Sequence, residues 1–109
     1  MTNYWAGKDV LVTGHTGFKG MWLSIYLKNM GAKVFGISDS GDDVEKILYR
    51  SVKNLEIFSG ESFIDIRDGD RTKKIISEIN PEIVFHLASQ PLVSESYLDP
   101  QITYKTNIF

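Results

Sequence analysis

Residues 10–20 read VLVTGHTGFKG, an apolar run that passes into glycines at positions 14, 17 and 20. The run predicts a short buried strand over Lys8–Thr13, and the apolar spacing after it predicts a helix from Phe18 to Met30. A turn between these elements gathers backbone N–H groups at the positive end of a helix. The stretch therefore predicts an anion site, at the place where a dinucleotide pyrophosphate binds in α/β proteins.

The three glycines of this loop have separate expected roles. Gly14 allows the tight turn, Gly17 lets the backbone approach the pyrophosphate, and Gly20 lets the helix pack against the strand. Lys19 adds a positive charge nearby. The spacing is G-x-x-G-x-x-G without a Gly-Lys-Ser/Thr ending, which disfavours ATP hydrolysis. The alternative interpretation is a flexible turn that binds nothing.

The first helix has a broad apolar stripe. The residues expected to face the core include Phe18, Met21, Trp22 and Ile25. Ser24 is expected on the polar side, and Gly31 is expected to end the helix.

A second strand is expected over Lys33–Ile37, and Ser38 and Asp39 follow it. An acidic residue at this point holds the ribose hydroxyls of a bound adenosine. Asp39 would repel a 2′-phosphate, so NAD is favoured over NADP as the cofactor. The alternative is that Asp39 only forms a turn.

The rest of the chain continues the alternation of helices and strands. Helices are expected over residues 44–52 and 69–79, and the second of these is capped by Asp68 and closed by Pro81. Residues 100–109 are expected to form the first part of a further helix. Strands are expected over Ser62–Ile66 and Glu82–Ala88. The pattern predicts a Rossmann-type, doubly wound α/β fold with about four parallel strands. Residues 1–109 are interpreted as the N-terminal part of one dinucleotide-binding domain.

Composition narrows the class of partner. The net charge is -2, which provides no basic field for a nucleic acid or an anionic membrane. There is no Cys, so disulfides and thiolate chemistry are excluded, and no run approaches the ~20 apolar residues of a membrane helix. A cytoplasmic protein is expected, with no metal site.

Further motifs add a family resemblance to the glycine loop. They are Asp65-Ile66-Arg67-Asp68, the stretch His86–Val93 (HLASQPLV), Ser96-Tyr97 and Thr106-Asn107. Together they resemble the extended short-chain dehydrogenase/reductase family over nearly all of the chain. Phe18-Lys19 and the stretch Gln90–Val93 are similar, more narrowly, to the CDP-glucose 4,6-dehydratases of that family.

The resemblance implies a role for individual residues in binding NAD. Residues 16–19 would line the pyrophosphate, residues 38–39 would flank the ribose, residues 65–66 would bracket the adenine, residues 87–90 would run beneath the cofactor, and Asn107 would approach the nicotinamide. The full implied set is Gly14, Thr16, Gly17, Phe18, Lys19, Gly20, Ser38, Asp39, Asp65, Ile66, Leu87, Ala88, Ser89, Gln90 and Asn107. Gln90 and Tyr97 are also implied to face the sugar nucleotide.

Some positions depart from the family or have simpler interpretations. Ser89 stands where Ala is usual, Ser94 where Arg is expected, and Ser38 where related epimerases have a ribose-binding Asp. The alternative for Asp65 is a local backbone cap, and the alternative for Tyr97 is a packing aromatic. His86 ends an apolar strand and is expected to be a core histidine.

The implied reaction oxidises the sugar of CDP-glucose at C4, eliminates water across C5 and C6, and returns the hydride to C6, in deoxysugar synthesis for polysaccharides. The family's base is the Tyr of a Y-x-x-x-K motif beyond the fourth strand. Tyr4 with Lys8 and Tyr49 with Lys53 match this spacing at the wrong places in the fold, so no catalytic residue is assigned.

The chain is accordingly expected to be the N-terminal portion of a longer enzyme, inactive alone and a homodimer when complete. A nucleotide-sugar epimerase or reductase of the same family, or a non-catalytic dinucleotide sensor, are the alternatives.

Overall fold

The computed structural model describes residues 4–39, 47–52, 55–88 and 105–108. Strands and helices alternate from the first strand to the fourth, and a fifth strand follows. In chain order the elements are β1 (Asp9–Thr13), α1 (Phe18–Asn29), β2 (Lys33–Ser38), α2 (Ile47–Val52), β3 (Phe58–Phe63), α3 (Gly69–Ile79), β4 (Ile83–His86) and β5 (Lys105–Ile108).

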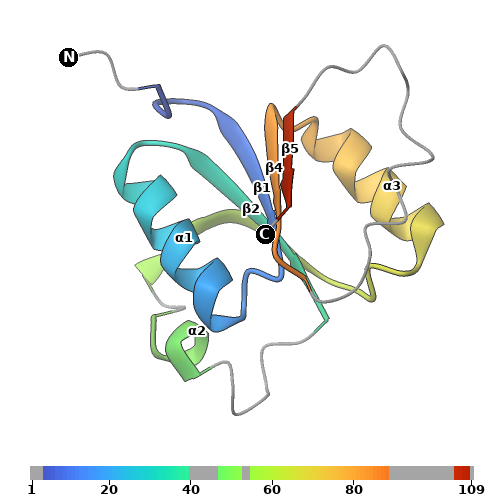
Figure 1. Cartoon of the computed structure of the whole chain (residues 1–109), viewed down its shortest axis with the longest axis horizontal. Helices are drawn as coiled ribbons and strands as arrows, with labels where there is room; N and C mark the ends of the chain where they lie inside the picture. The colour runs from blue at the N-terminus through green and yellow to red at the C-terminus, as the bar shows by residue number, and fades with distance from the viewer. Residues whose placement is uncertain (1–3, 40–46, 53–54, 89–104, 109) are drawn as a thin grey trace.

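One parallel sheet organises these elements, with the strand order β3-β2-β1-β4-β5. The chain first builds outward from β1 to β2 and β3, and α3 then returns it to β4 on the other side of β1. The helices α1 and α2 lie on one face of the sheet and α3 lies on the other (Figure 1). The expected doubly wound, Rossmann-type fold is confirmed, and β1 and β4 flank its topological switch point.

Apolar side chains fill both faces of the sheet. On one face, Val10, Val12 and Val34 pack with Leu27 of α1. On the other face, Leu11, Ile37, Ile64, Ile66 and Val84 pack with Ile76 of α3. The central strand β1 is thus buried on both sides, as its continuous apolar run predicts.

Helix α1 departs from its expected apolar stripe. Phe18 and Trp22 are 64% and 53% exposed, whereas Ser24 is fully buried and donates a hydrogen bond to the carbonyl oxygen of Gly20 at 2.7 Å. The core face of α1 instead combines Gly20 and Ser24 with Met21 and Leu27, and Gly20 lets the helix pack closely on the glycine loop. Gly31 follows the helix with φ +91°, the left-handed conformation that ends a helix.

The third strand begins earlier than expected. β3 spans Phe58–Phe63, and the predicted Ser62–Ile66 strand instead runs into the turn after it. The side chains of β3 alternate between exposed and half-buried, since β3 lies at the edge of the sheet. Its place is set by parallel pairing with β2, including an irregularity between Val34 and Phe35, which hydrophobicity does not reveal.

The expected helix at residues 100–109 is wrong for its described part. Lys105–Ile108 form β5, which pairs in parallel with β4 so that Phe85 lies opposite Asn107. This short segment is extended because the edge of β4 offers its backbone a row of hydrogen-bond partners, which local sequence does not reveal.

The observed bounds of helices α2 and α3 agree more closely with those predicted from the sequence. α2 begins at Ile47, and the earlier part of the expected helix lies outside the described residues. α3 spans the expected residues, and the Asp68 side chain accepts from the backbone N–H of Arg71 at its start. Among the described helices, none has the length and apolar character needed to cross a membrane.

Candidate dinucleotide site at the carboxyl edge of the sheet

The loops that follow β1, β2, β3 and β4 meet at the carboxyl edge of the parallel sheet. Backbone hydrogen bonds join them: Gly14 N–H donates to Ile37 O at 2.7 Å, and Leu87 N–H donates to Thr13 O at 3.0 Å. Ile64 N–H donates to Ser38 O at 2.8 Å. Ligands of doubly wound proteins bind at this edge, beside the switch point.

The glycine loop is held in close contact with its neighbours at two of its three glycines. Gly14 has φ +76°, and a Cβ there would lie 2.8 Å from the backbone nitrogen of Ala88. A Cβ at Gly20 would overlap the carbonyl oxygen of Gly14. Both positions therefore require glycine for the fold itself.

Gly17 is different, because the described residues do not fill the space beside it. Within the described part of the chain, a Cβ at Gly17 would meet only the Gly14 carbonyl oxygen, at 3.4 Å, which is an ordinary contact. Gly17 is also the N-cap of α1, and none of the described side chains caps that end of the helix. An open cradle at an uncapped helix N-terminus fits a pyrophosphate.

Thr16 and Ser38 join the glycine loop to the end of β2. Their hydroxyl oxygens lie 2.6 Å apart, and both side chains are buried. The Ser38 hydroxyl also donates to Asp39 Oδ1 at 3.5 Å. Asp39 itself is exposed. The proposed pyrophosphate and ribose contacts are thus linked through one pair of hydroxyl groups.

Thr13 joins β1 to β4 at the switch point, a role that the sequence did not indicate. Its hydroxyl lies 2.7 Å from His86 Nδ1 and accepts from the N–H groups of Leu87 and Ala88 at 3.1 and 3.4 Å. Because the oxygen accepts these bonds, its own proton is left to donate to Nδ1. His86 is therefore a buried, hydrogen-bonded histidine, as expected.

His15 was also missed, because it lies inside the loop and points into the protein. Its side chain is fully buried, and His15 Nε2 lies 2.9 Å from Glu61 Oε1 on β3. The ring packs against Phe58 at 4.6 Å between centroids, and it occupies the space where a Cβ of Gly36 would be. The signal for this contact was Gly36, since a glycine inside a strand often marks a close approach.

A separate cavity of about 410 Å³ lies between α1, α2 and β3. Its lining consists of Met21, Tyr49, Glu56, Ile57, Phe58 and Glu61. This described lining includes neither the glycines of the loop nor Leu87 and Ala88 after β4, so the cavity is distinct from the described part of the candidate dinucleotide site.

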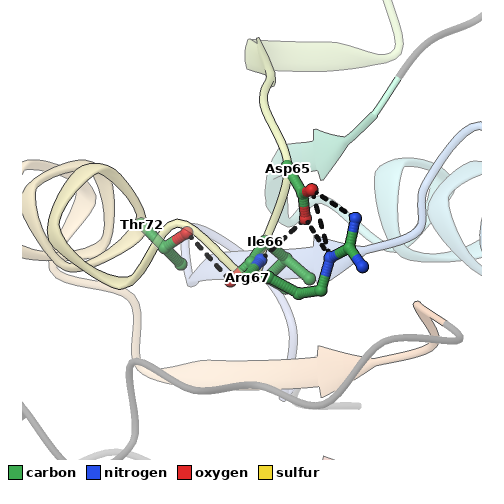
Figure 2. A network of polar contacts seen from close by, with 4 residues as sticks. All are labelled: Asp65, Ile66, Arg67 and Thr72. Atoms are coloured by element: carbon green, nitrogen blue, oxygen red, sulfur yellow. Dashed lines mark hydrogen bonds and ion pairs between the residues drawn. The ribbon is translucent and has the colours of Figure 1, made fainter.

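The turn after β3 presents a carboxylate held by its neighbour, as Figure 2 shows. The Arg67 guanidinium donates to Asp65 Oδ1 and Oδ2, with the shortest distance 2.7 Å from Nη2 to Oδ2, and Arg67 N–H donates to Oδ1 at 2.9 Å. These hydrogen bonds lower the pKa of Asp65 from 3.8 to about 2 and raise the pKa of Arg67. The side chain of Ile66 points into the core instead.

Some of the remaining residues predicted to bind the cofactor or the sugar nucleotide are described by the structure, and others lie outside the described residues. Phe18 and Lys19 are exposed at the start of α1, and Leu87 and Ala88 are half-buried after β4. Asn107 lies in β5. Ser89, Gln90 and Tyr97 lie outside the described residues.

Comparison with known proteins gives a family match over most of the chain. The sequence model of the GDP-mannose 4,6 dehydratase family matches residues 11–109. A CDP-glucose 4,6-dehydratase of Salmonella typhimurium is 50% identical over 107 residues, which are 97% of this chain and 29% of that protein. The resemblance noted from the motifs is thereby confirmed. The chain spans well under half the length of this relative.

Epimerases are similar at lower identity. A UDP-glucose 4-epimerase of Mycolicibacterium smegmatis is 36% identical over 100 residues, covering 90% of this chain and 30% of that protein. The crystal structure of a UDP-glucose 4-epimerase from Stenotrophomonas maltophila with bound NAD matches with a TM-score of 0.62 at 26% identity. That match covers 82% of this chain and 26% of the epimerase chain.

Proposed function

Because the chain belongs to the GDP-mannose 4,6 dehydratase family, we propose that it is the cofactor-binding portion of a nucleotide-sugar 4,6-dehydratase that acts on CDP-glucose. The observation that supports this substrate most directly is the 50% identity to a CDP-glucose 4,6-dehydratase, against 36% to the epimerase above. Residues 1–109 are proposed to form the N-terminal part of the dinucleotide-binding domain.

The proposed cofactor is NAD, and the residues at the carboxyl edge fit it. Gly17 leaves space for a pyrophosphate, and the exposed Lys19 supplies a positive charge. NAD would accept a hydride from the sugar and return it within one turnover. The exposed Asp39 would disfavour the extra phosphate of NADP.

The other contacts are proposed from the family resemblance. The proposed cofactor residues are Gly14, Thr16, Gly17, Phe18, Lys19, Gly20, Ser38, Asp39, Asp65, Ile66, Leu87, Ala88, Ser89, Gln90 and Asn107. The core position of the Ile66 side chain leaves the backbone of that residue as its proposed contact. Gln90 and Tyr97 are proposed to face the sugar nucleotide, and the complete enzyme is proposed to be a cytoplasmic homodimer.

The testing experiment is mass spectrometry of CDP-glucose after incubation with the product of the complete reading frame and NAD. The loss of one water from the sugar nucleotide is the expected result, because a 4,6-dehydratase removes water and regenerates its cofactor. A parallel incubation with UDP-glucose, which we expect to remain unchanged, tests the choice of nucleotide. CDP-glucose recovered intact from an enzyme that binds NAD would contradict the proposed reaction.

A nucleotide-sugar 4-epimerase is the second candidate, favoured by the matches to epimerases in both sequence and fold. The two functions share the cofactor half of the protein and differ in the product. An epimerase would leave the mass of the sugar nucleotide unchanged and alter its configuration at C4. Chromatographic separation of the product from the substrate at constant mass would support this candidate.

A further inference from the structure

The cavity between α1, α2 and β3 has the size of a small-molecule site. Helices α1 and α2 lie side by side on one face of the sheet, and β3 is the edge strand of the sheet on their side (Figure 1). The volume of about 410 Å³ falls within the range of roughly 300–1,000 Å³ that ligand pockets occupy. The proposed cofactor contacts are not part of its lining, so the cavity needs an explanation of its own.

The buried part of the lining is apolar and packed. Met21 is fully buried, and Tyr49 and Ile57 are each 7% exposed; these side chains form one core cluster. Phe58 packs against the same cluster from β3. Two of these side chains offer aromatic rings, which attract a cation placed over their faces. This part of the cavity therefore fits the apolar body of a ligand.

The charged part of the lining is entirely negative. Glu56 is exposed, and no described residue contacts its carboxylate through a hydrogen bond or an ion pair. The Glu61 side chain is 28% exposed, and its Oε1 lies 2.9 Å from His15 Nε2. An ionised carboxylate has about four lone-pair sites, so Glu61 keeps acceptor capacity beyond that contact. The lining residues include neither Lys nor Arg, so the cavity favours a cation and disfavours an anion.

This combination fits an organic cation better than a metal ion. A calcium ion takes roughly six to eight oxygen ligands, and the cavity offers two carboxylates. The described residues also contain no group of three or more acidic or histidine side chains placed to hold a metal. An ammonium group on an apolar body would use both parts of the lining, its charge at Glu56 and Glu61 and its body against the buried side chains.

We propose that this cavity is a second ligand site, separate from the proposed cofactor site, and that it binds a small organic cation with an apolar or aromatic body. The site adjoins the glycine loop, because Tyr49, Phe58 and Glu61 all contact the ring of His15. The ring centroids of Tyr49 and Phe58 lie 5.8 and 4.6 Å from that of His15. The inference goes beyond the proposed function and does not depend on it, since it requires no dinucleotide.

The test uses probes of similar size and different charge, titrated by calorimetry into the product of the complete reading frame at neutral pH. They are benzylamine as the cation, benzyl alcohol as the neutral compound and benzoate as the anion. Benzylamine is expected to bind with a dissociation constant of about 1 mM or tighter, and at least about tenfold more tightly than benzyl alcohol, because its ammonium group makes charge-assisted hydrogen bonds. Benzoate is expected not to bind, since it would meet like charge.

A resonance of the lining locates the bound probe. Met21 lines the cavity, and its methyl resonance is identified by its loss in Met21→Leu, a substitution that nearly conserves volume. In the wild type this resonance is expected to shift as benzylamine is added and to reach a plateau with the calorimetric dissociation constant.

Matched variants separate the site from the overall charge of the protein. Glu56→Gln and Glu61→Gln are each expected to weaken benzylamine binding at least about threefold, and the double variant is expected to bind it within about twofold of benzyl alcohol. Glu78→Gln removes the same charge from an exposed position on α3, on the opposite face of the sheet, and is expected to leave benzylamine binding unchanged. Circular dichroism verifies the fold of each variant. Glu56→Gln breaks no contact among the described residues, so it keeps the test decisive if Glu61→Gln, which alters the His15 contact, proves unstable.

Each outcome decides one part of the proposal. Equal binding of benzylamine and benzyl alcohol would overturn the assignment to a cation. An unshifted Met21 resonance, or an equal loss of affinity in Glu78→Gln, would overturn the location, because the probe would then bind elsewhere. The absence of saturable benzylamine binding would overturn the site itself. None of these results would alter the proposed function, which is tested separately with CDP-glucose and NAD.

Discussion

At the scale of single residues, substitutions at Gly17 and Gly20 are expected to affect different properties, cofactor binding at Gly17 and folding stability at Gly20. Gly17→Val is expected to weaken NAD binding by at least about tenfold, because the new side chain would occupy the space left for the pyrophosphate. The unfolding midpoint should change little, since among the residues that the structure describes a Cβ there meets only one ordinary contact. Calorimetric titration with NAD and urea denaturation of the same variant measure the two effects.

Gly20→Ala provides the contrasting variant. Alanine within a helix normally stabilises by about 0.5–1 kcal/mol relative to glycine. Here the Cβ would overlap the Gly14 carbonyl oxygen, and a loss of about 1–3 kcal/mol is expected instead. A more stable Gly20→Ala protein in urea denaturation would show that the loop does not press against α1 as described.

Asp65 and Arg67 provide a pH-dependent prediction. In the folded protein the pKa of Asp65 is lowered from 3.8 to about 2, chiefly by side-chain hydrogen bonds from Arg67. The pair therefore stabilises the fold above the unfolded pKa, and this contribution is lost as the pH falls through the folded pKa. In Arg67→Ala the pKa of Asp65 should return towards its ordinary value, as measured by NMR titration of the carboxyl carbon. An unchanged titration in that variant would refute the assigned cause.

At the scale of elements, Thr13 connects β1 to the segment after β4. Thr13→Val keeps the shape but leaves His86 Nδ1 and the Ala88 N–H without this partner. The expected loss is about 1–3 kcal/mol in the free energy of unfolding. Thr72→Val, which removes one longer hydrogen bond to Ile66 O, is expected to cost about 0.5–1.5 kcal/mol. Equal losses in chemical denaturation would mean that Thr13 has no special connecting role.

The start of α3 depends on a capping side chain. Asp68→Ala is expected to cost about 0.5–2 kcal/mol, because the hydrogen bond to Arg71 N–H is lost. Asp70→Ala is the control in the same first turn, and it should cost only about 0.3–1 kcal/mol through the helix dipole. Thermal unfolding of both variants measures the difference, and a more damaging Asp70→Ala would contradict the capping assignment.

At the scale of the whole molecule, a bound dinucleotide should stabilise the fold through mass action. NAD at 100 times its dissociation constant is expected to raise the free energy of unfolding by about 2.7 kcal/mol. NADP at the same concentration should raise it less, because its extra phosphate approaches Asp39. Asp39→Asn should narrow that difference in a thermal shift measurement. Equal shifts with both cofactors in the wild type would contradict the proposed preference for NAD.

Much of this architecture could be predicted because its signals are local. The apolar run of β1, the cap at Asp68 and the glycines at 14, 17 and 20 each depend on neighbours close in sequence. The edge strand β3 could not be placed correctly, because its hydrogen bonds come from β2 and its own residues are not strongly apolar. The sequence predicts a helix where β5 forms for the same reason, since the conformation of β5 follows from its pairing with β4.

The sequence by itself determined the doubly wound order of elements and the position of the glycine loop. The spacing of apolar residues and the conformational freedom of glycine are both properties of short segments of chain. Tertiary structure alone decided that Thr13 bonds His86, that His15 reaches Glu61 through the space left by Gly36, and that the Ile66 side chain joins the core. These residues lie on different strands or loops and come into contact only when the sheet has formed. Their contacts depend on strand order and register, which no local pattern specifies.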